Sequence, residues 1–446
     1  MQIRIVATAL ATLMTLTTMA HAKPGDLDSS FGSKGIVVTD IGNNQDMAES
    51  IAIQNDGKIL AAGCSKNSSN NDVFTIVRYR TNGLLDSSFG TDGRVTTTTG
   101  NSGGDCANSI FIQNDGKIVA AGGLTIVRYN ENGALDGSFG NGGKVSTGTV
   151  DIYDAVIQND GKIVAAGNAY NGSDLDFAVV RYNSDGTVDS TFGNGGKVIT
   201  PIGSSYDRIV GVAIQSDGKI VVAGNSDYGD LSGNKYFALV RYTNNGVLDN
   251  TFGNNGKVLT AVGGNYDSAS SLSIQKDGKI IVAGNSDGNG KEDFAVVRYT
   301  NNGVLDNTFG NNGKVLTAVG IGGDYAADIA IQNNGKIVVV GTSFSFEASD
   351  MVVAIVRYDS NGTPDNLFGN NGKVTTNISS GGDEATNVAI QNDGKIVIVG
   401  FSNNSSSNSA FAIARYLGDS TPIPAPVPTP IPTAISLAPI YKLLLQ

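Results

Sequence analysis

The sequence predicts an all-β protein, a seven-bladed β-propeller built from four-stranded antiparallel blades. Three phrases each occur seven times in a fixed order over residues 27–416: Arg-Tyr, Asp-x-x-Phe-Gly and Ile-Gln-x-Asp/Asn-Gly-Lys. In addition, the 23 residues Arg241–Gly263 recur without a difference at Arg298–Gly320. A structural unit gains from such copying, whereas a catalytic site is needed once in a chain. We therefore expect seven equivalent blades arranged in a ring.

Each repeat of about 56 residues contains four short runs rich in β-branched residues and bounded by Gly, Asn and Asp. This pattern is typical of strands and not of helices. The Asp-Gly or Asn-Gly after each Ile-Gln favours a tight hairpin, because Gly takes positive φ freely. Pro201 and Pro364, the two prolines of the repeat region, fall between strands. In the fifth repeat the predicted strands are 257–260, 271–275, 279–284 and 294–299.

The polarity of the strands predicts their order within a blade. The Ile-Ala-Ile-Gln strand and its hairpin partner are the most apolar, so we expect that strand to be innermost, covered by blades on both sides. The Gly-Lys-Val-x-Thr strand carries Lys and Thr and is expected at the outer edge. Residues 35–40 then supply the outer strand of the blade whose other strands lie near 389–416. This pairing closes the ring.

The Asp-x-x-Phe-Gly phrase is interpreted as one turn of helix. Asp caps free N–H groups, Phe fills the gap between neighbouring blades, and Gly takes the left-handed position that ends the turn. The Arg of each Arg-Tyr pair is expected to form an ion pair with this Asp or to bind backbone carbonyls, in preference to binding a ligand. These structural residues are Asp28, Asp86, Asp136, Asp189, Asp249, Asp306 and Asp365, with Arg78, Arg128, Arg181, Arg241, Arg298, Arg357 and Arg415.

The same phrases resemble a known family. Leu-Asp-Ser-Ser-Phe-Gly-x-x-Gly, Ile-Gln-Asn-Asp-Gly-Lys-Ile and Val-Arg-Tyr are similar to the bacterial delta-60 repeat, a β-propeller domain of unknown function, and the similarity covers Leu27–Tyr416. The resemblance implies a propeller in an exported bacterial protein. It brings no established activity and no catalytic residues that transfer to this chain.

Residues 1–22 read as a signal peptide. Arg4 precedes an apolar run at 5–19, and Ala20-His21-Ala22 is a small-x-small cleavage signal, so the mature chain is expected to begin at Lys23. The apolar run of about 15 residues is shorter than the roughly 20 needed to span a bilayer. We therefore expect an exported protein, located in the periplasm, at the cell surface or in the medium, with no integral membrane span.

The propeller is expected to occupy residues 23–418, and the composition changes after it. Proline stands at every second position from Pro422 to Pro432, which is typical of an extended spacer. A short apolar stretch, interrupted by Pro439 and Lys442, follows. We expect residues 419–446 to be a disordered spacer and tail.

The net charge and the missing residue types exclude several classes of function for the mature chain. Residues 23–446 contain 29 basic and 41 acidic residues, a formal net charge of −12, and neither His nor Trp. Binding of nucleic acid is not expected, because it requires a basic surface. The lack of His excludes Ser-His-Asp hydrolysis and His-built metal sites. We expect no cofactor and no metal.

Antiparallel strands predict which loops share a face. The Asp-Gly hairpins and the Asp-x-x-Phe-Gly turns lie together on one face and are nearly invariant among the repeats. The loops before each inner strand, and those between the second and third strands, lie together on the opposite face. They differ freely, as in SKNSSNND, SDYGDLSGNKY and TSFSFEASD. Variable loops on a rigid frame are where binding usually resides.

Two sets of residues on this variable face are candidates for binding. Aspartates precede six of the Ile-Gln phrases by seven residues; they either bind calcium at the channel mouth or, as we prefer, bond to backbone N–H groups of their own loops. Loop aromatics either form a surface for glycans or peptides or pack on their own loops. The aspartates are Asp46, Asp105, Asp207, Asp267, Asp324 and Asp383, and the aromatics are Tyr170, Tyr206, Tyr228, Tyr236, Tyr266, Tyr325, Phe344 and Phe346. The residues proposed for binding on this face are Tyr170, Tyr206, Tyr228, Tyr236, Tyr266, Tyr325, Asp207, Asp267 and Asp324.

Cys64 and Cys106, the two cysteines, belong to adjacent repeats and map to the variable face. A pair of cysteines in an oxidising compartment suggests a disulfide, although spacing alone leaves the bond open.

We therefore expect a monomeric, exported propeller that binds a protein or glycan partner through its variable face. The alternatives are a glycoside hydrolase or lyase that uses carboxylates alone, and a purely structural surface protein. The enzyme alternative is less favoured because acids recur with the repeat and none is singled out, whereas such chemistry needs two carboxylates in unlike environments.

Overall fold

The computed structural model describes residues 22–419 except 43–44, 101–105, 204–205, 228–233, 289, 346–349 and 404–407. Its strands form seven separate four-stranded sheets, and no helix occurs among these residues. The fold is an all-β, seven-bladed propeller, as predicted. The predicted leader, and the tail after residue 419, lie outside the described residues.

Six blades are continuous in sequence. Blade one contains β2 (Met47–Ile53), β3 (Ile59–Lys66), β4 (Asp72–Tyr79) and β5 (Arg94–Thr97); blade two β6 (Ser109–Ile112), β7 (Ile118–Gly122), β8 (Thr125–Tyr129) and β9 (Lys144–Ser146); blade three β10 (Val150–Ile157), β11 (Ile163–Tyr170), β12 (Leu175–Tyr182) and β13 (Lys197–Thr200). Blade four contains β14 (Asp207–Ile214), β15 (Ile220–Asp227), β16 (Lys235–Tyr242) and β17 (Lys257–Thr260); blade five β18 (Asp267–Ile274), β19 (Ile280–Ser286), β20 (Asp293–Tyr299) and β21 (Lys314–Thr317). Blade six contains β22 (Asp324–Ile331), β23 (Ile337–Ser345), β24 (Asp350–Tyr358) and β25 (Lys373–Thr376).

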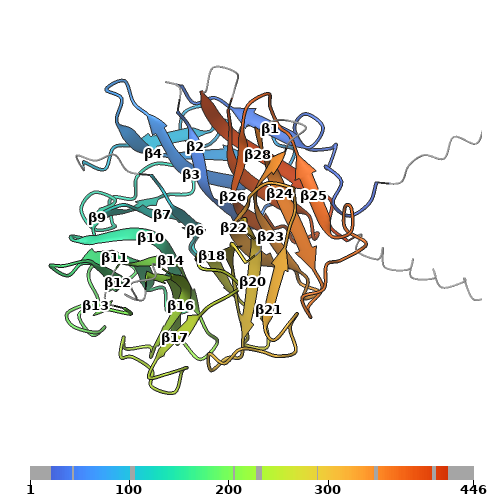
Figure 1. Ribbon diagram of the computed structural model, residues 1–446. Helices are drawn as coiled ribbons and strands as arrows, with labels where there is room; N and C mark the ends of the chain where they lie inside the picture. Colours follow the sequence, from blue (N-terminus) through green and yellow to red (C-terminus); the bar gives the residue numbers. More distant parts are fainter. Residues whose placement is uncertain are drawn as a thin grey trace, which may run out of the picture.

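Blade seven joins the two ends of the propeller. It contains β26 (Asp383–Ile390), β27 (Ile396–Asn403) and β28 (Ser409–Tyr416), with β1 (Ile36–Thr39) as its outer strand. β1 pairs antiparallel with β28 in the register Ile36 to Ala414, and Figure 1 shows the two strands side by side. The predicted closure of the ring is confirmed.

The order of the strands within each blade also matches the prediction. The first strands of neighbouring blades lie against one another around the axis, and the short fourth strands lie at the rim (Figure 1). The inner strand has a neighbouring blade on each side, as expected, but it is not the most buried strand of its blade. β15 and β16 are almost wholly buried, whereas β14 alternates between buried and solvent-accessible residues. The inner strand has a neighbouring blade on each side but also borders the channel.

The inner strands begin earlier than the sequence predicts. In the fifth repeat β18 starts at Asp267, four residues before the predicted start at Ser271. A β-bulge between Ala269 and Ser271 interrupts its pairing with β19, and five other inner strands carry a bulge at the equivalent place. The extra residue breaks the alternating pattern, so the early part of the strand is difficult to recognise from the sequence.

The Asp-x-x-Phe-Gly segment is a tight turn and not a turn of helix. In blade four the Phe252 N–H donates to the Asp249 carbonyl, and the Asp249 side chain accepts from the Thr251 N–H and hydroxyl. Gly253 has a φ of 51°, the left-handed position expected of it. Phe252 is completely buried among strands of blades four and five, so it does fill the gap between blades.

The arginine of each Arg-Tyr pair links two blades. Arg241 Nε lies 2.9 Å from Asp249 Oδ2, its guanidinium lies 4.6 Å from the centre of the Phe252 ring, and its Nη1 donates to the Asn301 carbonyl in blade five. All seven arginines make the ion pair and the ring contact. Arg241 therefore has both of the structural roles that we considered, because it forms an ion pair with the aspartate and donates to a backbone carbonyl.

A disulfide joins blades one and two on the variable face. Cys64 at the end of β3 is bonded to Cys106 in the connection before β6, and their Cα atoms are 4.5 Å apart. No helix in the described part of the chain is long and apolar enough to cross a membrane.

Candidate functional site

The face that carries the Asp-Gly hairpins, here called the repeat face, uses its polar side chains to join blades. In blade three Lys162 Nζ lies 2.8 Å from Asp189 Oδ2, and Gln158 accepts from Arg181. The amide of the same glutamine donates to Asn244 Oδ1 in blade four at 3.0 Å. A cavity of about 480 Å³ on this face is lined by the ends of β10, β14 and β18, including Gln158. The repeated residues of this face therefore belong to the scaffold.

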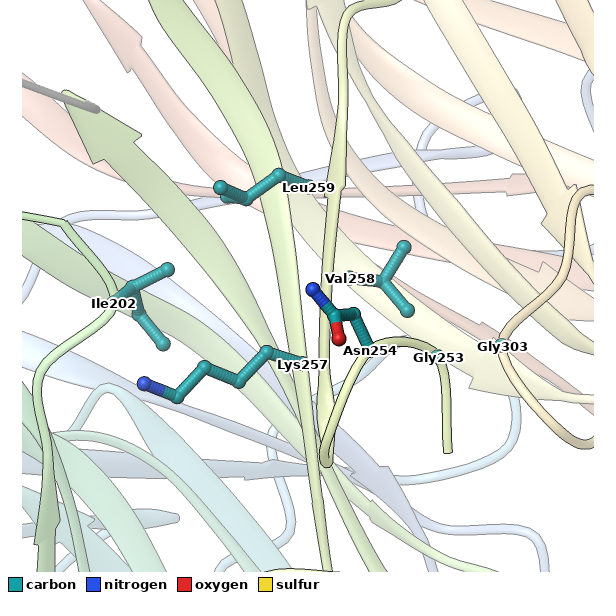
Figure 2. Close-up of a pocket in the computed structure, with 7 residues that line it drawn as sticks. All are labelled: Ile202, Gly253, Asn254, Lys257, Val258, Leu259 and Gly303. Carbon is teal, nitrogen blue, oxygen red and sulfur yellow. The ribbon is translucent and has the colours of Figure 1, made fainter. Parts of the chain in front are cut away.

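Grooves at the rim also repeat with the blades. A groove of about 430 Å³ lies beside β17, where Ile202 lies across from Lys257 and Leu259 (Figure 2). Grooves of the same volume lie beside β5 and β21. Lys257 Nζ donates to the Pro201 carbonyl at 2.6 Å, and equivalent lysines do the same in other blades. Because the grooves recur and their lysines join neighbouring blades, we assign them to the scaffold.

The opposite face, here called the variable face, contains the loops between second and third strands and the connections that precede the inner strands. Its predicted aspartates close these connections. Asp267 accepts from the Val262 N–H at 2.6 Å, and Asp207 from the Ile202 N–H at 2.7 Å. Asp46, Asp207, Asp267, Asp324 and Asp383 are all completely buried. Asp105 lies outside the described residues.

This burial corrects the expectation that Asp207, Asp267 and Asp324 contribute to a binding surface. Their carboxylates face backbone donors of their own loops, so a ligand on the variable face does not reach them. The preferred interpretation of these residues, a bond to the backbone of their own loop, describes the observed contacts.

The predicted tyrosines occupy one sector of the variable face. Tyr170, Tyr206, Tyr266 and Tyr325 are 64%, 57%, 56% and 39% exposed, and they belong to blades three to six. They are the exposed tyrosines of the described chain. Tyr170 donates to the Gly172 carbonyl of its own loop, and the Tyr325 hydroxyl lies 3.4 Å from Glu292 Oε2 in blade five.

The remaining aromatics contribute less to this surface. Tyr236 lies within β16 and Phe344 within β23, and both are only partly exposed. Tyr228 and Phe346 lie outside the described residues.

Hydrogen bonds join neighbouring inner strands around the middle of the channel. In five blades the residue that follows the bulge, or its equivalent, accepts from a backbone N–H of the next inner strand; examples are Asp154 from Val212, and Asp328 from Val388, both at 2.9 Å. Burial raises the pKa of both aspartates to about 6, against the hydrogen bonds that lower it. Ser50, Ser109 and Asn387 make the equivalent bond in other blades. These contacts hold neighbouring inner strands together.

Arg208 and Tyr153 form a pair where the channel opens on the variable face. Arg208, exposed near the start of β14, lies 5.3 Å from the centre of the Tyr153 ring of β10 and donates to its hydroxyl at 2.9 Å. Asp151, also in β10, has a pKa raised by burial and lowered by the charge of Arg208. The tyrosine orients the guanidinium without neutralising it.

Two of the five glutamates of residues 23–446 lie at the same mouth, on the neighbouring blades seven and one. Burial, and secondly the charge of Glu384, raise the pKa of Glu49 to about 7. Burial also raises the pKa of Glu384. Glu49 lies in β2 and Glu384 in β26, and none of the described salt bridges includes either residue. Sequence reasoning missed Glu49, Glu384, Arg208 and Tyr153 as site residues, because the two positions that they occupy differ from blade to blade and carry no repeated pattern.

The seven repeated blades place this chain in the class of seven-bladed β-propeller repeat proteins. The family model described as a domain of unknown function (DUF5122) beta-propeller matches residues 54–89, 113–139, 158–192, 215–252, 275–309, 332–368 and 391–422. The chain belongs to this family. The match confirms the resemblance to a β-propeller repeat family of unknown function. No curated protein matches the chain.

Several solved structures are similar to the chain at low sequence identity. A catalytically inactive virginiamycin B lyase from Staphylococcus aureus is 12% identical with a TM-score of 0.50, covering 85% of this chain and 98% of that one. Sqt1 from Chaetomium thermophilum, bound to the N-terminus of ribosomal protein L10, is 12% identical with a TM-score of 0.47 and the same coverage. A protein of unknown function from Dyadobacter fermentans is 10% identical with a TM-score of 0.44, covering 86% of this chain and 98% of that one. These likenesses concern the fold alone.

Proposed function

We propose that this protein is an exported binding module that captures a protein or glycan partner through its variable face. The observation that carries the proposal is the sector of exposed tyrosines on blades three to six, set against a repeat face and rim whose polar groups are used within the scaffold. Tyrosine gives a large, rigid contact area at low entropic cost and retains a hydroxyl for hydrogen bonding. β-Propellers as a class commonly act as binding and interaction modules.

Tyr206 and Tyr266 are suited to a test of this surface. They occupy equivalent connections in blades four and five, and each is more than half exposed, so alanine is expected to leave the fold intact. The matched control replaces Val247 and Val304, which are equally exposed but lie in turns of the repeat face.

The experiment uses the mature protein as bait for envelope extracts with chemical cross-linking, together with a glycan array. We expect Tyr206→Ala with Tyr266→Ala to abolish capture or glycan binding and Val247→Ala with Val304→Ala to preserve it. Equal loss in both variants, or no loss in the tyrosine variant, contradicts a binding role for the variable face.

Export is part of the proposal. Residues 1–22 have the features of a cleaved leader, and a disulfide is typical of an oxidising compartment. The full chain is expected to yield a product beginning at Lys23 outside the cytoplasm when it is expressed in a bacterium. N-terminal sequencing of that fraction is the test, and retention of an intact leader in the cytosol counts against export.

A glycoside hydrolase or lyase remains the second candidate because of Glu49 and Glu384. They form a pair of carboxylates that the other blades do not repeat, and the pKa of Glu49 is raised to about 7, which suits a general acid. Incubation with a panel of polysaccharides, followed by chromatography, is the test. Activity lost in Glu49→Gln supports this candidate, and absence of any product removes it.

A further inference from the structure

One position of the inner strand can be compared among all seven blades. It is the residue whose backbone carbonyl packs against a glycine that every second strand carries. At each of these glycines an added Cβ would lie 1.8–2.0 Å from that carbonyl oxygen, so the seven positions are structurally equivalent. No two of them carry the same residue type. The seven positions, here called the mouth ring, are Met47, Cys106, Asp151, Arg208, Ser268, Tyr325 and Glu384.

The next residue along the strand behaves in the opposite way. It is Ala or Ile in all seven blades and is buried in each of them; these residues are Ala48, Ala107, Ile152, Ile209, Ala269, Ala326 and Ala385. The scaffold therefore dictates the side chain at one position and leaves the adjacent position unconstrained. Cys106 is fixed by its disulfide with Cys64, and the other six positions are free to differ between blades in a chain that elsewhere copies 23 residues without change, as variable binding positions on a rigid frame do.

The mouth ring is accessible from the variable face. Asp151, Arg208, Tyr325 and Glu384 are exposed, and the other three side chains are partly buried. All seven lie near the start of an inner strand, and these strands lie against one another around the axis. A ligand at the channel mouth would therefore contact several of them at once.

The charges around this ring form an acidic side and a mixed side, in which the carboxylate of Asp151 on blade three lies near Arg208. Glu384 and Glu49 lie on blades seven and one, which are neighbours across the closure of the ring. Arg208, stacked on Tyr153, lies on blade four, across the ring from them. The carboxylates repel each other, and burial adds to the cost of the charge on Glu49. A cation beside them would relieve both costs, while the remaining N–H groups of Arg208 suit a carboxylate.

We infer that the channel mouth binds a peptide segment that carries both charges, with its ammonium or guanidinium group at Glu49 and Glu384 and its carboxylate at Arg208. This inference rests on the proposed function and names the ligand class for the same face. A polyanion fits poorly because two carboxylates share the mouth, and a neutral glycan uses neither charged side. A peptide also suits Tyr325, which lies on blade six between the charged sides, and Met47, which lies on blade one beside Glu49, because both offer apolar contact.

The test selects binders from a random heptapeptide library displayed on phage, using the mature protein as immobilised target. A selected peptide is then synthesised, and its affinity is measured by calorimetry with the wild type, Arg208→Gln, and Glu49→Gln with Glu384→Gln. Matched controls are Arg80→Gln and Glu131→Gln, which change exposed side chains in turns of the repeat face. Circular dichroism establishes that every variant is folded.

We expect the selected peptides to carry at least one basic and one acidic group. Each mouth variant should weaken binding roughly tenfold or more, since a charge-assisted contact is lost, and the controls should not change it. In addition, Arg208→Glu should reject the original peptide and bind a peptide whose acidic residue is replaced by lysine.

Two results overturn the inference. One is a selected peptide that lacks one of the two charges or binds the mouth variants as tightly as the wild type. The other is a library that yields no binder. Neither result disproves the broader binding function, which the paired tyrosine variants test separately with envelope extracts.

Discussion

Phe31 offers a direct test of how the ring closes. Its side chain is completely buried between blades seven and one, and the Arg415 guanidinium stacks over its ring at 4.5 Å. We expect Phe31→Ala to lower the free energy of unfolding by about 3–5 kcal/mol, the usual cost of removing a buried aromatic side chain and leaving a cavity. The assay is equilibrium unfolding in urea, followed by circular dichroism because the chain has no Trp.

The repeat supplies a matched control for this experiment. Phe252 is also completely buried and has the equivalent neighbours, but it lies between blades four and five, where the chain is continuous. Phe252→Ala should cost the same within about 1 kcal/mol if the closure is as well packed as any other junction. A loss of less than about 1 kcal/mol for Phe31→Ala, beside the full loss for Phe252→Ala, would refute the closed ring in solution.

Three further predictions follow from the packing and electrostatics of the scaffold. Arg241→Ala should cost about 3–5 kcal/mol in urea, because a buried aspartate loses the shorter of its two ion pairs, keeping only Lys219 at 3.4 Å, and the bond to the blade-five carbonyl is lost as well; removing that aspartate as well should recover part of the loss. Burial raises the pKa of Asp154 and Asp328 to about 6 from an ordinary 3.8, so the folded state takes up protons first and stability should rise as the pH falls from about 6 to about 4. Asp154→Asn with Asp328→Asn should reduce that rise in thermal melts at the two pH values; an unchanged slope contradicts the assignment. Cys64→Ser with Cys106→Ser should cost about 4 kcal/mol, since the bond closes a loop of 42 residues, and equal stability of the oxidised and reduced protein would disprove it.

The fold was predictable because its determinants recur. Seven copies of the same phrases indicate the number of blades, the hairpins and the outer strand supplied by residues 35–40, since each copy tests the interpretation of the others. The Asp-x-x-Phe-Gly turn was misinterpreted because a capping Asp and a left-handed Gly serve a tight turn as well as a helix end. In this turn Asp249 accepts a hydrogen bond from a backbone N–H and Gly253 takes a positive φ, although no helix is present.

The candidate site was less predictable for the opposite reason. Loop aspartates such as Asp267 attract attention as ligands, yet whether a carboxylate faces solvent or its own backbone depends on the path of the loop. Arg208 and Glu384 lie inside strands, where a single odd residue resembles ordinary variation. Their importance is recognisable only when the structure aligns the seven copies residue by residue.

The one-way contacts between blades have a consequence for cooperativity. Six of the arginines donate to a carbonyl of the next blade, as Arg415 of blade seven does to Thr81 of blade one, and Arg357 of blade six binds the Asp419 carboxylate that follows blade seven, so the contacts run around a circle. Linear repeat proteins unfold gradually from their exposed terminal units. A circle has no terminal unit at which such fraying starts, and opening any one junction removes support from the blades on both sides.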